Sequence, residues 1–203
     1  MRFLTAAVLL LVAATVNADR LVTIPVGKKV LNRTFRIEGL LDPADWGRGR
    51  FSLAAGLTQN IDAEIYRDRL SSGRDFTSFD VAYNQSAPIT DLTPGISVGL
   101  LDALNETELG RRVFGAITFR VGLQGDTVND VPLEVTIGAA TNVRRPIFVG
   151  VLVPFSPTYR ILAEHDGERI TAGFEFRPGA GLVARALFRR DRTFVSLSLT
   201  HRF

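Results

Sequence analysis

The sequence of 203 residues contains no cysteine, one methionine, one tryptophan and only two histidines. The absence of cysteine excludes a disulfide scaffold, a thiolate metal site and cysteine-based catalysis. The two histidines, His165 and His201, leave little material for a histidine-rich metal centre. Lysine is scarce as well, because 22 of the 24 basic residues are arginine, and 21 acidic residues reduce the formal net charge to +3. A nearly balanced charge gives no reason to expect binding to a polyanion, and the length fits one domain.

The first apolar run is short and lies at the amino terminus. Arg2 precedes it, residues 3–16 are almost wholly apolar, and Val16-Asn17-Ala18 places small residues where a cleavage site needs them. Roughly 14 apolar residues fall short of the ~20 that a membrane-spanning helix requires. We therefore expect a cleaved signal peptide over 1–18, followed by a segment, 19–32, that is either periplasmic or an extra strand. An exported chain of this kind is secreted, periplasmic or inserted in an outer membrane as a barrel.

The rest of the sequence alternates between apolar and polar residues, which is the pattern of β-strands. In the final run, Val195, Leu197, Leu199, His201 and Phe203 fall on one face, and the residues between them are polar. Turn-forming residues separate about twelve such runs. The runs are 33–42, 49–57, 60–68, 75–83, 94–102, 112–122, 132–140, 146–153, 158–166, 168–177, 181–189 and 193–203. A sustained helical period is absent, so the sequence predicts an all-β domain over 33–203.

The polar faces of these runs carry charges in mid-strand, which separates a membrane barrel from a soluble β-sandwich. A sandwich points its apolar faces inward, whereas a membrane barrel points them at lipid and keeps polar residues inside. An even number of ~10-residue strands also fits a bacterial barrel, and closure leaves no unpaired sheet edge in lipid. We therefore predict a closed antiparallel up-and-down transmembrane β-barrel of about 12 strands, located in the outer membrane. The charges assigned to its lumen include Arg36, Glu38, Glu134, Arg160, Glu164, Glu175 and Arg185.

The final strand resembles that of Gram-negative outer-membrane proteins in general, in which it carries the assembly signal. Val195, Leu197, Leu199 and Phe203 match that pattern, and His201 is a polar departure from it. The resemblance implies that the barrel-assembly machinery is a partner.

Three stretches in the second half of the chain are more particular. They are Pro146-Ile-Phe-Val-Gly-Val151, Leu162-Ala-Glu-His-Asp-Gly167 and Ala172-Gly-Phe-Glu-Phe-Arg-Pro178. Together they resemble the carboxy-terminal barrel region of YjbH-like proteins, a family linked to exopolysaccharide production, over residues 50–203. His165 replaces the usual aromatic residue and Phe174 the usual leucine. The resemblance implies a structural or accessory role in surface exopolysaccharide production or export, and it supplies no catalytic residue.

The width of the lumen leaves a second function open. Twelve strands ~4.8 Å apart and tilted by ~40° close at a radius of roughly 12 Å, which inward side chains largely fill. Buried charges need partners, and the expected pairs are Arg36 with Glu38, Arg160 with Glu164, and Glu175 with Arg177. Such an interior is either a packed structural core or the lining of a small passive or selective pore.

Arginines concentrate in the odd-numbered connections between strands. In a barrel with periplasmic termini these connections face outward, and they hold 13 of the 22 arginines. Guanidinium groups suit phosphate and carboxylate, so we expect a rim that contacts lipopolysaccharide or an anionic surface polysaccharide. The rim comprises Arg67, Arg69, Arg74, Arg111, Arg112, Arg144, Arg145, Arg189, Arg190 and Arg192.

Catalysis is not expected from this sequence. Some outer-membrane enzymes use a serine–histidine pair on the outer wall, but strand alternation puts His201 on the face opposite Ser196 and Ser198. A barrel enzyme acting on envelope lipids is therefore the least favoured alternative. No cofactor, metal ion or nucleic acid is indicated, and the expected partners are outer-membrane lipids, lipopolysaccharide and surface polysaccharide or its export proteins.

Overall fold

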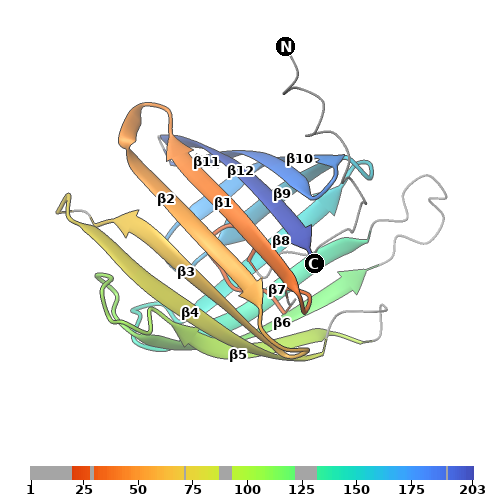
Figure 1. The fold of residues 1–203 in the computed structure, drawn as a ribbon, viewed down its shortest axis with the longest axis horizontal. Coiled ribbons are helices and arrows are strands. Elements are labelled where there is room, and N and C mark those ends of the chain that lie inside the picture. Colours follow the sequence, from red (N-terminus) through yellow and green to blue (C-terminus); the bar gives the residue numbers. More distant parts are fainter. Residues whose placement is uncertain (1–19, 28–29, 71, 87–92, 122–131, 191) are drawn as a thin grey trace, which may run out of the picture.

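The computed structural model describes residues 20–27, 30–70, 72–86, 93–121, 132–190 and 192–203, so the expected signal peptide lies outside the described residues. Twelve strands pair in chain order, and β1 pairs with β12 to close the barrel (Figure 1). The strands are β1 (Thr34–Asp42), β2 (Asp45–Gly56), β3 (Ile61–Arg69), β4 (Asp75–Ser86), β5 (Gly95–Leu101), β6 (Arg112–Val121), β7 (Leu133–Ala140), β8 (Ile147–Pro154), β9 (Tyr159–His165), β10 (Ile170–Gly179), β11 (Leu182–Arg189) and β12 (Arg192–Arg202). The predicted closed antiparallel barrel of 12 strands is thereby confirmed. Among the described residues no helix is long and apolar enough to cross a membrane.

The observed strands follow the predicted runs with small changes at their ends. The second strand begins at Asp45 instead of residue 49, and the fourth continues to Ser86 instead of ending at 83. At the closure, Ile37 of β1 lies opposite Leu199 of β12, so that apolar residues of the two strands share the outer face.

The barrel is apolar outside and polar inside. On β12, Leu197 is 57% exposed, while its neighbour Ser196 is 1% exposed. The same contrast occurs on β10, where Phe174 is 56% exposed and Glu175 is 1% exposed. This distribution is the reverse of that in a soluble β-sandwich, in which the apolar face is buried.

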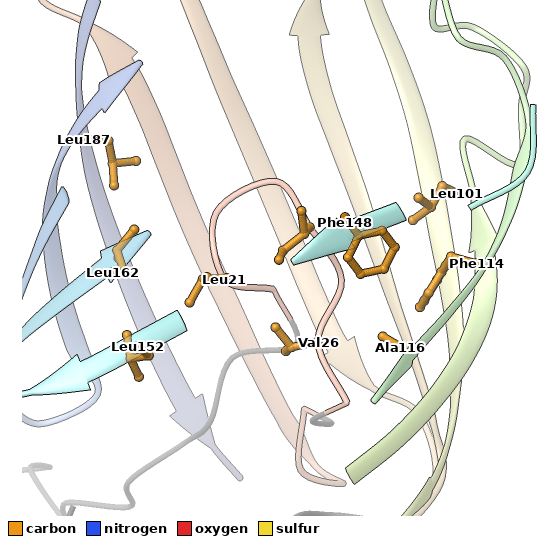
Figure 2. Packing of buried hydrophobic residues seen from close by; sticks show 10 residues of the cluster. Leu21, Val26, Leu101, Phe114, Ala116, Phe148, Leu152, Leu162 and Leu187 are labelled. Carbon is orange, nitrogen blue, oxygen red and sulfur yellow. The ribbon is translucent and has the colours of Figure 1, made fainter. Parts of the chain in front are cut away.

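Residues 20–27, which we call the inner segment, lie inside the barrel. Figure 2 shows Leu21 and Val26 on a loop that the strands surround. The two arms of this loop meet in an isolated bridge between Arg20 and Pro25. The sequence predicts a periplasmic segment or an extra strand over 19–32, whereas the described part of this range mainly occupies the lumen. The physical reason is an apolar patch on the inner wall, formed by Leu101, Phe114, Ala116, Phe148, Leu152, Leu162 and Leu187, against which the segment packs.

Candidate functional site

A cavity of about 730 Å³ opens at the barrel end that carries the odd-numbered connections. Its walls come from strand ends and from the connections that follow β5, β7, β9 and β11. Its floor is the inner segment, which contributes Arg20, Thr23, Ile24 and Pro25. We call this cavity the vestibule. Two cavities farther in, beside the inner segment, measure only about 20 Å³ each.

The vestibule carries an excess of positive charge. Nine arginines and five acidic residues line it. Three carboxylates just outside the lining pair with some of these arginines, Glu64 with Arg20 and Arg50, Asp75 with Arg69, and Asp42 with Arg192, so the excess is small and rests on the other five arginines. The arginines are Arg20, Arg50, Arg69, Arg112, Arg145, Arg169, Arg189, Arg190 and Arg192, and the acidic residues are Asp68, Asp80, Glu108, Asp166 and Glu168. A concave surface with an excess of one charge concentrates solutes of the opposite charge, so this cavity favours anions.

The deepest arginines are held by carboxylates of the wall. Arg20 Nε lies 2.8 Å from Glu64 Oε2, and Arg20 also pairs with Asp80. Arg50 lies 3.0 Å from the other oxygen of Glu64, and its guanidinium stacks 4.0 Å from the centre of the Tyr66 ring. These groups form a fixed, neutralised base beneath the vestibule.

Other arginines of the vestibule have no carboxylate partner. In the described part of the chain, Arg112, Arg145, Arg169 and Arg190 form no ion pair and donate no side-chain hydrogen bond, and Arg112 Nε is buried. Arg189 donates to the neutral hydroxyl of Thr171 at 2.8 Å. Because a guanidinium without a counter-charge binds carboxylate and phosphate well, these residues are the candidate anion ligands.

Asp102 holds the connection between β5 and β6 in place at the edge of the vestibule. Its carboxylate accepts hydrogen bonds from the Ser78 hydroxyl at 2.5 Å, the Thr107 hydroxyl at 2.6 Å, and the amides of Glu106 and Thr107 at 2.9 and 2.8 Å. Burial by itself would raise the pKa of this carboxyl, but the hydrogen bonds from Ser78 and the 106–107 backbone outweigh it and lower the pKa. The loop therefore presents Thr107 to the cavity in a fixed position.

The seven charges that the sequence assigns to the lumen all lie on the inner face. Five of them are at most 7% exposed, and Glu38 and Arg160 are partly buried. Arg36 lies 3.7 Å from Glu38, and Arg177 lies 2.5 Å from Glu175, as expected.

The third expected pair is wrong. Arg160 lies 3.9 Å from Glu175 rather than beside Glu164. Glu164 binds the inner segment instead, because it accepts hydrogen bonds from the amides of Val22 and Thr23. Arg160 and Glu164 share the inner face of β9 because they are four residues apart, but the cross-strand register brings Arg160 opposite Glu175.

The expected rim divides into two groups. Arg69, Arg112, Arg145, Arg189, Arg190 and Arg192 line the vestibule. The remaining four, Arg67, Arg74, Arg111 and Arg144, lie outside its lining. Two of those four have acidic partners, since Arg67 pairs with Asp75 and Arg74 with Glu106.

The residues of the expected assembly signal lie on the outer face. Val195, Leu197 and Leu199 are 46–57% exposed. The Phe203 amide donates to the carbonyl of Arg33 at 3.0 Å, and its ring lies 6.3 Å from that of Phe35. His201 is also exposed, whereas Ser196 and Ser198 are buried on the inner face. These serines and this histidine therefore cannot form a catalytic pair.

Sequence reasoning missed the inner segment and, with it, the floor of the vestibule. A signal was present, because Leu162 lies between the inward residues Arg160 and Glu164, and Leu187 lies between Arg185 and Arg189. Apolar residues that face a lumen need an apolar partner, and the nearest unassigned apolar stretch precedes the first strand.

A closed 12-strand barrel with charges inside and apolar residues outside defines a β-barrel of the transmembrane type, here with an arginine-rich cavity at one end. Consistent with this class, the chain resembles the KdgM porin in fold. One structure of the KdgM porin aligns with a TM-score of 0.51 and 10% identity, covering 84% of this chain and 99% of that one. A structure of the KdgM porin in complex with disordered oligogalacturonate aligns with a TM-score of 0.49 and the same identity and coverage.

At this identity the likeness is one of fold alone. No protein-family model and no curated protein sequence matches the chain. The comparisons therefore give no support to the resemblance to YjbH-like proteins or to a role in exopolysaccharide production.

Proposed function

We propose that the protein is an outer-membrane β-barrel that acts as a selective pore for small anionic solutes. The observation that carries this proposal is the arginine-lined vestibule within a barrel whose outer face is apolar. Large exposed apolar side chains such as Phe51, Ile65 and Leu197 occur around the whole wall. A soluble protein rarely exposes so much contiguous apolar surface, whereas lipid requires it.

The polarity of the vestibule supports selection for anions over cations. Its unpaired arginines come from separate elements: Arg112 from the start of β6, Arg145 from the connection before β8, and Arg190 from the turn before β12. Guanidinium groups spread around a cavity are able to pass an anion from one to the next. The shared fold with the KdgM porin is compatible with a pore as well.

Swelling of proteoliposomes tests this function. Parent protein should admit glucuronate faster than a neutral hexose, and a hexosamine more slowly than either. The variant Arg112→Gln/Arg145→Gln/Arg190→Gln should lose most of this order. A matched control, Arg67→Gln/Arg74→Gln/Arg144→Gln, changes three arginines at the same end but outside the cavity lining, and it should retain the order. Absence of swelling with every solute, in the parent and in a folded variant that lacks residues 20–27, would contradict the proposal, and so would an unchanged order in the first variant.

The orientation in the membrane is part of the same proposal. Bacterial barrels keep both termini in the periplasm, which places the vestibule on the cell exterior. Contact with lipopolysaccharide then falls to Arg67, Arg74 and Arg144, which lie outside the cavity lining. A cysteine introduced at Arg190 should react with an impermeant maleimide on intact cells; reaction only after the outer membrane is opened would reverse the orientation.

A closed structural barrel is a second candidate, favoured by one observation. The inner segment and the side chains around it reduce the cavities beside it to about 20 Å³ each. A structural barrel would stay closed to every solute, so the swelling experiment separates the two functions.

A further inference from the structure

The inner segment is bound to the barrel wall by apolar contacts. Leu21, Ile24 and Val26 are 9%, 2% and 5% exposed, although each belongs to a loop rather than to a strand. Figure 2 shows Leu21 close to the side of Leu152 and Leu162, and Val26 between them and Ala116. Without the segment, this apolar patch of the wall would face water inside the lumen.

One carboxylate binds most of the backbone donors at the tip of the segment. Glu164 of β9 accepts hydrogen bonds from the amides of Val22 at 3.0 Å, Thr23 at 3.0 Å and Ile24 at 3.4 Å. It also accepts the Thr23 hydroxyl at 2.6 Å. Hydrogen bonds to an ionised acceptor are about twice as strong as those between neutral groups, so Glu164 is the main polar contact of this tip.

Side chains of other strands bind the remainder of the segment. The Gly27 amide donates to the Thr118 hydroxyl at 2.7 Å, and the Ser97 hydroxyl donates to the Val26 carbonyl at 3.2 Å. Arg20 pairs with Glu64 on β3. The segment is therefore held from β3, β5, β6 and β9, which lie on different sides of the lumen.

The wall also leaves room for the segment. A Cβ atom added at Gly150 of β8 would lie 2.6 Å from Ile24 Cδ1 and 2.7 Å from Leu21 Cδ2. A larger residue at this position would have to displace the ends of these two side chains, so glycine here permits the close approach. The geometry thus shows a specific binding site for residues 20–27 on the inner wall.

We propose that the inner segment is an inbuilt plug that keeps the pore closed, and that conduction requires its release from this site. The inference rests on the proposed pore function. It adds that the closed state is the stable one, that Glu164 and the apolar patch maintain it, and that the vestibule is continuous with the opposite end of the barrel only when the segment has moved.

A disulfide tests the plug in the full-length chain. The double variant Leu21→Cys/Gly150→Cys places two thiols on facing positions of the segment and the wall, and the parent sequence has no other cysteine. In planar bilayers the oxidised protein should show no openings, and a reductant should restore them to the level of the same double variant that was never oxidised. Equal currents before and after reduction would overturn the proposal.

Loss of the Glu164 carboxylate should act in the opposite direction. Glu164→Gln replaces an ionised acceptor by an amide that presents hydrogens to the segment, and the open probability should rise by about tenfold. Glu106→Gln, on an exposed loop outside the cavity lining, is the matched control and should leave the open probability unchanged. An open probability for Glu164→Gln equal to that of the control would overturn the role of Glu164.

A labelling experiment reports on the plug without any current. A cysteine at Ile24, which is 2% exposed, should react slowly with a maleimide, and about tenfold faster when combined with Glu164→Gln. Rapid reaction in the otherwise unchanged chain would overturn the proposal.

Deletion of residues 20–27 tests the plug and the pore function separately. Large, constant conductance in the deletion variant supports both the pore and the plug. If the deletion variant conducts no better than the parent protein, the plug is excluded and the pore remains. If no variant conducts, including a deletion variant shown to be folded by its heat-modifiable migration, the pore function itself fails and the plug proposal with it.

Discussion

At the scale of single residues, Glu175 is a buried carboxylate that forms ion pairs with Arg160, Arg177 and Arg185. It is 1% exposed and lies 2.9 Å from Arg185 and 2.5 Å from Arg177. Removing one member of a buried ion pair leaves the other charge uncompensated, which costs about 3–5 kcal/mol in a dry site. Glu175→Gln should therefore lower the free energy of unfolding by about 3 kcal/mol, measured by urea titration in lipid vesicles.

Glu106→Gln is the matched control for this measurement. Glu106 pairs with Arg74 at 3.5 Å on the surface, where its side chain is 43% exposed. Loss of an exposed pair costs at most about 1 kcal/mol. Equal losses of stability in the two variants would show that Glu175 is hydrated rather than buried among arginines.

Asp102 gives a prediction about pH. Its pKa is lowered in the folded protein, so its hydrogen bonds stabilise the fold above the ordinary carboxyl pKa of 3.8 and lose this contribution as the pH falls through the lower folded value. The difference in thermal stability between the parent and Asp102→Asn should be constant from neutral pH to about pH 5 and should shrink below pH 3.8. A difference that grows on acidification would contradict the assignment of an ionised Asp102.

The inward direction of the charged residues could be predicted from the sequence, but not all their partners. A strand has a period of two, so the sequence is enough to assign Arg160, Glu164 and Glu175 to one face. Pairing depends on the register between strands, which bulges and turn lengths determine. In the structure Glu175 lies opposite both Arg160 and Arg185, and this explains why Arg160 does not pair with Glu164.

At the scale of elements, we expect the outer face of each strand to contact lipid, and this contact can be tested by introducing a charge. Leu197 lies in the middle of β12 and is 57% exposed. An arginine on the lipid face near the membrane centre costs about 2–4 kcal/mol, so Leu197→Arg should destabilise the protein by this amount in vesicles. Leu104→Arg is the control, because Leu104 is 52% exposed in the connection between β5 and β6. Similar stability of the two variants would indicate that water rather than lipid surrounds the barrel.

The final strand predicts the outcome of a truncation. Phe203 extends β12 by a hydrogen bond to Arg33, next to the β1–β12 closure. If its aromatic ring is part of the assembly signal, deletion of Phe203 should leave the chain in the periplasm, where it is degraded or aggregates. Cell fractionation and heat-modifiable migration measure this. Normal recovery of the truncated chain in the outer membrane would contradict the signal.

The inner segment shows where sequence reasoning stops at this scale. Residues 20–27 have no regular period, and their contacts with β9 and β6 join positions far apart in the chain. Local patterns do not encode such contacts, whereas every strand follows from alternation and turn residues. Leu162 is an apolar side chain on the inner face of β9, between charged residues. Its position is explained by the inner segment, whose apolar residues belong to the same buried cluster.

At the scale of the whole molecule, the described residues form a wide cavity at one end of the barrel and narrow cavities farther in. The vestibule at one end measures about 730 Å³, and the inner segment closes its floor. Five arginines of this wide part have no carboxylate partner among the described residues, whereas farther in Glu175 pairs with Arg177 and Arg185. The molecule therefore combines an anion-attracting mouth with a closed interior, and the predicted concentration of arginine in the odd-numbered connections now has a location inside the cavity as well as on the rim.

The central claim is that the barrel conducts anions, and the zero-current potential across a planar bilayer tests it most directly. Potassium chloride is placed at unequal concentrations on the two sides of a bilayer that contains the variant lacking residues 20–27. The zero-current potential should then have the sign expected of a chloride-selective pore. The variant Arg112→Gln/Arg145→Gln/Arg190→Gln in the same background should shift it toward zero. A potential with the sign set by potassium, or no ionic current at all through the folded protein, would contradict the account.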